Sequence, residues 1–166
     1  MKDGPDIALV GSLVGDPDVA QALEALMGLA ARAGHLRVRT GPKDPEMRQA
    51  RVCYDHLAGD LGVKLFDRLQ GRKLIDGGGD DLGVTGSGRR FFADFGIPLD
   101  GLGGRRRPVC RPCLDWSERR HHLGGSLGSA LLTRFFDLKW AKRDSGSRVV
   151  HFSPRGLAQF EAFLDG

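Results

Sequence analysis

The stretch "HLAGDLGVKLFDRL" at residues 56–69 occurs a second time, in altered form, as "HLGGSLGSALLTRF" at residues 122–135. The two copies share His, Leu, Gly, Leu, Gly, Leu and Arg at a constant spacing of 66 residues. Identities held at one spacing indicate an internal repeat, so each copy is expected to form the same supersecondary unit. Each unit is also expected to depend on the other to bury its apolar face.

Similar segments follow both copies. A short polar turn, "DGGGDD" or "RDSGS", is flanked by strand-like residues, and a helix then opens as "TGSGRRFFADF" or "SPRGLAQFEAF". The order helix, helix, two-stranded wing, helix is the plan of a winged helix. The sequence therefore predicts a mainly α fold with small β wings (α+β), with tandem winged-helix-like units at residues 45–104 and 105–166.

Upstream, each copy begins with a cysteine and an aspartate. The alignment places Arg51, Cys53 and Asp55 beside Arg111, Cys113 and Asp115, with six extra residues, "WSERRH", in the second copy. Pro45 and Glu46 are typical of a helix start, and the pattern predicts one helix running from them through "RQARVCYDHLAG".

The segment "LAGDLGV" at residues 57–63 looks like the first half of a helix-turn-helix. Only nine residues, 64–72, separate it from the strand-like residues of the first wing. These are too few for a turn, a separate recognition helix and the approach to a strand. Both units are therefore predicted to be winged-helix scaffolds without a reading helix, and sequence-specific recognition of bases by either is not expected.

The N-terminal part is predicted to be helical. Residues 6–14 read as a short apolar helix, and a second helix follows with Asp16 as N-cap, Pro17 in its first turn and Gly34 as its stop. An apolar stripe on the second helix, at helical spacing, is either core or a dimer seam; it consists of Val19, Leu23, Leu26, Met27 and Ala30. We assign residues 1–44 to dimerisation helices and a basic linker, with residues 6–33 making a homodimer contact.

Charge is unevenly distributed along the chain. Residues 105–166 hold twelve Lys or Arg against six Asp or Glu, whereas residues 1–104 hold thirteen against fifteen. The excess points weakly to an anionic partner such as DNA, although a solvated basic surface explains it equally well. The candidate phosphate-binding side chains are Arg105, Arg106, Arg107, Lys142, Arg143 and Arg148. Alternatively, several arginines of this region pair with Asp115, Glu118 and Asp144.

Cellular location and cysteine chemistry follow from composition. No apolar run is long enough to cross a bilayer, and acidic residues stand where a secretory signal would be basic, so a cytoplasmic protein without membrane contact is predicted. Three cysteines are too few for a disulfide framework, and in a reducing compartment they are free, metal-bound or redox-active. No catalytic triad, phosphate-cradling loop or carboxylate pair is evident, so an enzyme is not predicted.

The cysteines and histidines suggest a metal site. Cys53 and His56 are three residues apart and would share one face of the predicted helix, and Cys113 with His122 or His121 could complete a four-ligand set. Thiolate and imidazole are the usual ligands of zinc and similar divalent transition or heavy metal ions.

Other roles for these residues stay open. Cys110 and Cys113 form a lone CxxC, Cys53 and Cys113 could be a redox pair, and buried cysteines often have only a structural role. Asp55 and Asp115 could be oxygen ligands, but helix caps or arginine partners are favoured. Trp116 is predicted to be a core anchor.

Three stretches, "DIALVGSLVGDP", "RTGPKDPEMRQARVCYDHLAG" and "RPCLDWSERRHHLGGSLGSALL", together resemble one group within the ArsR/SmtB family of bacterial winged-helix transcriptional repressors. The resemblance implies a dimeric DNA-binding repressor that an effector, often a metal ion or metalloid, releases from its operator. In that group a winged helix-turn-helix follows the opening helix, whereas here Asp16 and Pro17 run almost directly into the later helix. The alternative is thus a dimerisation and effector module without sequence-specific DNA binding.

Overall fold

The computed structural model describes residues 17–32, 41–103 and 107–166, and the chain divides into two units, residues 1–39 and 40–166. In the first unit, helix α2 spans Pro17–Arg32, which confirms the second predicted helix. The expected helix at 6–14, the caps Asp16 and Gly34, and most of the basic linker lie outside the described residues. Three leucines of α2 are well exposed, namely Leu23, Leu26 and Leu29.

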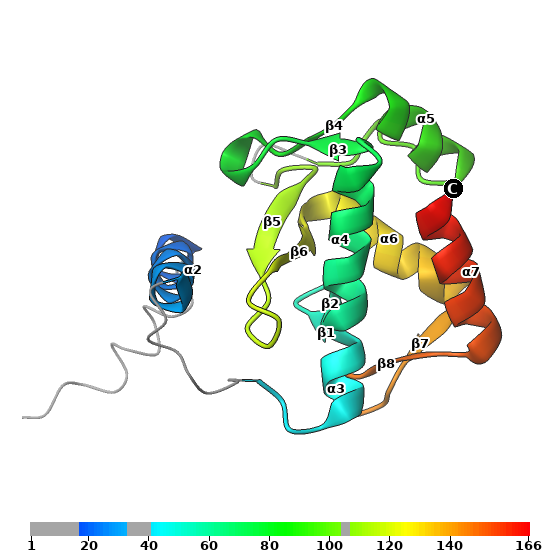
Figure 1. Cartoon of the computed structure of the whole chain (residues 1–166). Helices are drawn as coiled ribbons and strands as arrows, with labels where there is room; N and C mark the ends of the chain where they lie inside the picture. Colours follow the sequence, from blue (N-terminus) through cyan, green and yellow to red (C-terminus); the bar gives the residue numbers. More distant parts are fainter. Residues whose placement is uncertain (1–16, 33–40, 104–106) are drawn as a thin grey trace, which may run out of the picture. The chain divides into compact units, whose positions relative to one another are not determined.

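The second unit consists of hairpins and helices in a repeated order (Figure 1). After the short helix α3 (Pro45–Gln49), the first repeat comprises β1 (Arg51–Cys53), β2 (His56–Ala58), α4 (Asp60–Gly71), β3 (Ile75–Asp76), a 3-10 turn η1 (Gly79–Asp81), β4 (Gly83–Val84) and α5 (Gly86–Asp94). The second repeat comprises β5 (Arg111–Leu114), β6 (His121–Gly124), α6 (Gly125–Asp137), β7 (Ala141–Arg143), β8 (Val150–Phe152) and α7 (Pro154–Asp165). Each repeat is therefore hairpin, helix, hairpin, helix, and the predicted α+β class with winged-helix-like units is confirmed.

The prediction of one helix from Pro45 through the segment around Cys53 is wrong. Helix α3 ends at Gln49, because the backbone of Ala50 is already extended (φ −154°, ψ 130°). Residues 51–53 and 56–58 then form an antiparallel hairpin, with Tyr54 in the turn in the left-handed region (φ 56°). A strand pair buries Val52 and Leu57 as cross-strand partners, and this tertiary burial outweighs the local helical pattern.

The helix-turn-helix interpretation of residues 57–63 is also wrong. Leu57 and Ala58 belong to strand β2, and Leu61, Gly62 and Val63 lie inside α4 rather than at a turn. As the spacing required, one helix fills the space before the first wing, since α4 continues to Gly71 and β3 starts at Ile75. The corresponding α6 is likewise a single helix.

Glycines let α4 and α6 pack closely on the hairpins. A Cβ at Gly62 would lie closer than 3.0 Å to the carbonyl oxygen of Leu57, and one at Gly128 equally close to that of Leu123. Each helix therefore lies directly on the second strand of its own hairpin. The repeated glycine of the sequence alignment is explained by this backbone contact.

The wings and the helices after them match the predictions. Thr85 accepts a hydrogen bond from the Gly88 N–H at 3.0 Å, and Ser153 accepts one from the Gly156 N–H at 3.0 Å. Each hydroxyl is thus an N-cap that fixes the start of α5 or α7. The polar turns between the wing strands lie where the repeat placed them.

Both repeats contribute to one hydrophobic core. Phe92 of the first repeat and Phe135 and Phe160 of the second are completely buried, and the rings of Phe95 and Phe163 lie 4.3 Å apart. Phe92 and Phe160, like Phe95 and Phe163, are equivalent positions of the repeat. Equivalent positions of the two repeats thus lie in one shared core. Within the described ranges, no helix is both long and apolar enough to span a bilayer.

Candidate metal centre

Two cysteines and two histidines converge where the hairpins of the two repeats meet. Cys53 faces His56 across β1 and β2, and Cys113 faces His122 across β5 and β6. Their four potential ligand atoms all lie within 4.8 Å of one another, and the Nε2 atoms of the two histidines are 3.1 Å apart. The structure thus brings together Cys53 and His56, as expected, but as cross-strand partners in a hairpin rather than on one face of a helix.

The donor set suits a tetrahedral metal ion. Bonds of about 2.0 Å to nitrogen and 2.3 Å to sulfur place neighbouring ligand atoms of a tetrahedral zinc site roughly 3.3 to 3.8 Å apart. The four atoms of this cluster are within 4.8 Å, so movements of about 1 Å would be enough to reach that geometry. Thiolate and imidazole are also ligands that zinc-like ions prefer, whereas magnesium and calcium prefer oxygen ligands.

The electrostatics favour one thiolate in the cluster. A hydrogen bond from Cys113 lowers the pKa of Cys53 strongly, against the opposing effect of burial, and His122 and His56 add to the lowering. A thiolate rather than a thiol binds metal, so Cys53 is prepared for coordination. Both cysteines are half-buried, whereas both histidines are buried.

A buried carboxylate lies behind His122. Asp115 accepts hydrogen bonds from Arg51 Nη2 at 2.6 Å, from the Gly59 N–H at 2.8 Å, and from the N–H and hydroxyl of Ser117 at 2.9 and 2.8 Å. Burial alone would raise the pKa of Asp115, but the bonds from Gly59 and Ser117 and the Arg51 charge outweigh it and lower the pKa to about 2. Its Oδ2 lies 3.7 Å from Nδ1 of His122.

His56 has a similar carboxylate. Its Nδ1 lies 3.3 Å from Oδ1 of Asp55, whose Oδ2 accepts from Arg107 Nη2 at 2.5 Å. Partial burial opposes ionisation of Asp55, but Arg107 and His56 together lower its pKa. Both aspartates therefore have arginine partners, one of the two roles that the sequence favoured over metal coordination.

One buried polar atom of the cluster lacks a partner. His122 is 1% exposed, and its Nδ1 is the one fully buried side-chain nitrogen or oxygen in the described residues without a hydrogen bond. An unpaired buried donor or acceptor is costly, and such atoms are often explained by an ion or a water. Oδ2 of Asp115 lies 3.7 Å from this Nδ1, just beyond hydrogen-bond reach. The unpaired atom therefore fits a metal site better than a purely structural histidine pair.

Three residues considered from the sequence lie outside the cluster. Cys110 is 4% exposed within the hydrophobic core, and burial raises its pKa to about 11, so the CxxC interpretation is not supported. His121 packs its ring near Phe66 instead of entering the cluster. Trp116 is 58% exposed, so the prediction of a core anchor is wrong; its neighbours Asp115 and Ser117 occupy the interior of the β5–β6 connection.

A comparison with known proteins bears on the function independently of the Cys/His cluster. The chain is 35% identical over 150 residues to a protein of Bacillus subtilis (strain 168) named "Uncharacterized HTH-type transcriptional regulator YdfF". This chain is a relative of an HTH-type transcriptional regulator. The matched residues are 90% of the chain and span 66% of that protein, slightly less than two thirds of its length. No family model matches the chain, and no solved structure does so significantly.

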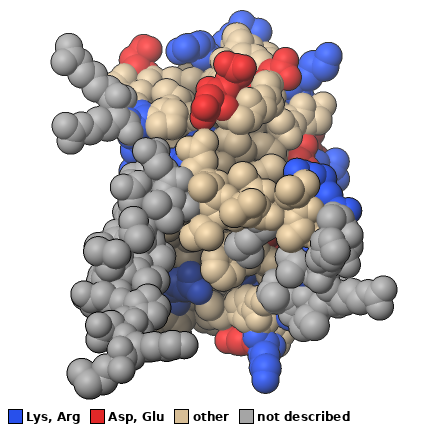
Figure 2. All heavy atoms as spheres, turned by 90° about the vertical axis from the view of Figure 1, so that its left-hand side faces the viewer, with Lys and Arg blue, Asp and Glu red and all other residues tan. Residues whose placement is uncertain are grey.

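Three of the basic residues predicted to contact phosphate are consecutive, at positions 105–107. Arg105 and Arg106 lie outside the described residues, and Arg107 is paired with Asp55. Arg120 pairs with Asp67, so for Arg107 and Arg120 the acidic partners differ from Asp115, Glu118 and Asp144. Figure 2 shows basic and acidic side chains interspersed on the face drawn.

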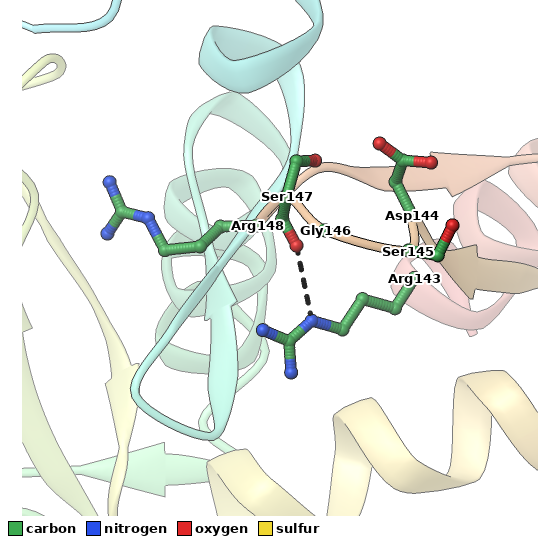
Figure 3. A pocket seen from close by; sticks show the side chains of 6 residues that line it. All are labelled: Arg143, Asp144, Ser145, Gly146, Ser147 and Arg148. Atoms are coloured by element: carbon green, nitrogen blue, oxygen red, sulfur yellow. Dashed lines mark hydrogen bonds between the residues drawn. The ribbon is translucent and has the colours of Figure 1, made fainter.

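The second wing carries the remaining candidates. Its turn is hollowed, and the hollow is lined by residues 143–148 (Figure 3). Arg143 donates through Nε to the carbonyl oxygen of Ser147 at 3.4 Å, while the guanidinium of Arg148 extends away from the turn. Lys142 is exposed on β7. Lys142, Arg143 and Arg148 thus remain predicted phosphate contacts.

Proposed function

We propose that this chain is the metal-responsive part of an ArsR-like, DNA-binding transcriptional regulator of the cytoplasm. The observation that carries the proposal is the convergence of Cys53, His56, Cys113 and His122 within 4.8 Å. The chemistry of these donors favours a divalent, zinc-like ion. In this proposal residues 1–44 dimerise, and the repeats at 45–104 and 105–166 form the sensing unit.

The proposed ion would join the two repeats. Cys53 and His56 come from the first repeat, and Cys113 and His122 come from the second. An ion bound by all four would therefore stabilise the arrangement in which the β1–β2 and β5–β6 hairpins are adjacent. When bound, it supplies no chemistry other than these four bonds, and its effect is to shift the population of conformations toward that arrangement.

The proposal of DNA binding rests on the similarity to an HTH-type regulator, and not on a recognition helix among the described residues. Both α4 and α6 are single helices beside hairpins, and α6 offers few polar side chains for base edges. The second candidate function is therefore a dimerisation and effector module without sequence-specific DNA binding. That the chain spans 66% of its relative is compatible with either function.

A gel-shift assay on the promoter of the protein's own gene tests the proposal and separates these functions. Specific retardation that zinc changes at least several-fold is expected if the chain is a metal-responsive regulator. Binding that ignores sequence and is abolished by added salt would favour the effector module, since phosphate contacts alone are strongly salt-dependent. Cys53→Ser is the matched variant, because it removes a metal ligand and should remove only the response to zinc.

The homodimer is proposed from α2. Leu26 is 62% exposed and Leu29 57% exposed on this helix, and burial of such side chains against a second copy would be favourable. The predicted contact also includes residues 6–16, which lie outside the described part. We expect Leu26→Glu to shift the protein from dimer to monomer, at least tenfold in Kd, when measured by sedimentation. Exposed Arg32→Glu, on the same helix, is the control; equal dissociation of both variants would contradict the proposed seam.

A further inference from the structure

Each histidine of the cluster is associated with a carboxylate, and each carboxylate is held by an arginine from the other repeat. His122 and Asp115 belong to the second repeat, but Arg51 is on β1 of the first. Conversely, His56 and Asp55 belong to the first repeat, whereas Arg107 precedes β5. The arrangement is therefore crossed, because each repeat supplies the arginine that pairs with the carboxylate of the other.

We propose that Asp55 and Asp115 are positioning residues of the metal centre, and that Arg107 and Arg51 fix their carboxylates; this rests on the metal site proposed above. An imidazole that donates its Nδ1–H to a carboxylate presents the lone pair of Nε2 on its other side. In both histidines Nδ1 faces the carboxylate and Nε2 faces the cluster. Asp55 thus favours the tautomer and ring orientation of His56 that coordination requires, and Asp115 is placed to do the same for His122, whose Nδ1 lies 3.7 Å from its Oδ2.

The two halves differ in how firmly the carboxylate is held. The side chain of Asp115 is completely buried and receives several hydrogen bonds in addition to the Arg51 pair. The side chain of Asp55 is 41% exposed, with Arg107 and His56 as its main partners. Asp55 can therefore be changed with little loss of folding stability, which makes it the better residue for a test.

The chain offers a closely matched control. Asp67 pairs with Arg120 at 2.5 Å and is 39% exposed, whereas Asp55 pairs with Arg107 at 2.5 Å and is 41% exposed. The two ion pairs are thus alike in length and exposure, but among the described contacts only Asp55 has a histidine of the cluster as a partner. A difference in metal affinity between Asp55→Asn and Asp67→Asn therefore measures the effect of the Asp55 contact with His56.

The test is titration of the full chain with cobalt(II), followed by its visible absorption, and then displacement by zinc in the presence of a competing chelator. Asp55→Asn is expected to weaken metal affinity by roughly 10- to 100-fold and to change the cobalt spectrum, because loss of the carboxylate frees the His56 ring. Asp67→Asn should bind as the wild type does. The metal-free melting temperatures of the two variants should agree, which a merely structural role of Asp55 would not predict.

The outcomes are distinguishable. Cobalt binding by the wild type together with an unchanged affinity and spectrum in Asp55→Asn would overturn the positioning role while leaving the metal site intact. A wild-type protein that takes up neither cobalt nor zinc would overturn the metal site and this assignment together. Equal weakening in Asp55→Asn and Asp67→Asn would also overturn the assignment, because the effect would then be general surface electrostatics.

Discussion

Zinc is expected to raise the free energy of unfolding of this protein by about 4 kcal/mol when free zinc is a thousand times its dissociation constant. The four proposed ligands lie on two hairpins separated in sequence by about sixty residues, so they converge only in the folded chain. An ion bound by all four stabilises the folded state without equal binding to the unfolded state. For a chain of this size the melting temperature should rise by roughly 8 to 16 °C.

Thermal unfolding under reducing conditions, with zinc and then with excess chelator, measures this shift. Cys53→Ser should lose most of the increase, because a hydroxyl is a poor substitute for thiolate at a zinc-like site. Magnesium is the matched control ion and should have no comparable effect, since it prefers oxygen ligands. Identical melting of the wild type in zinc and in chelator would contradict the site.

Asp115→Ala is expected to destabilise the folded protein by about 3 to 5 kcal/mol, independently of metal. The change leaves the Arg51 guanidinium, which is 7% exposed, without its carboxylate. It also removes the acceptor of the Gly59 N–H that precedes α4 and of the Ser117 N–H. Urea unfolding of the metal-free chain measures the loss. Asp67→Ala, which breaks an exposed pair, should cost less than about 1 kcal/mol; similar losses in both would contradict the argument.

The same buried carboxylate predicts part of the acid sensitivity. The pKa of Asp115 is about 2 in the folded protein and 3.8 for an ordinary aspartate. Because the folded-state pKa is the lower one, this stabilisation is fully present above about pH 4 and is lost as the pH falls from 3.8 towards 2. The loss is about 2 kcal/mol. The pH dependence of unfolding between these values should be shallower in Asp115→Asn, which lacks the titrating group.

Much of the repeat architecture was predictable, because it depends on local signals. Constant spacing of His, Leu and Gly residues revealed two units, polar turns marked the wings, and Thr85 and Ser153 marked the starts of the final helices. Such features depend on interactions between residues that are close in sequence. Residues 45–59 were predicted as a helix, but the chain forms a hairpin after Gln49, because strand pairing and burial of Val52 and Leu57 are not local.

The metal cluster was predictable in its membership but not in its geometry. Thiol and imidazole in both copies of the repeat identified Cys53, His56, Cys113 and His122 as candidates, although the expected helical face was the wrong means of bringing the first pair together. The pairing of each aspartate with an arginine of the other repeat was harder to predict from the sequence. Asp55 and Asp115 are aligned by the repeat, but their partners Arg51 and Arg107 are not equivalent positions and become neighbours only across the interface of the repeats.

Some features of this protein are thus set by the sequence itself, and others only by tertiary packing. Side-chain chemistry, turn positions and the duplication are properties of the linear chain, and they specify two similar units that share an aligned cysteine and an aligned histidine. Packing decides that both units contribute phenylalanines to one core and that their first hairpins meet. That packing places two imidazole nitrogens 3.1 Å apart with a carboxylate near the Nδ1 of each ring, because the two hairpins are distant in sequence and become neighbours only in the folded chain.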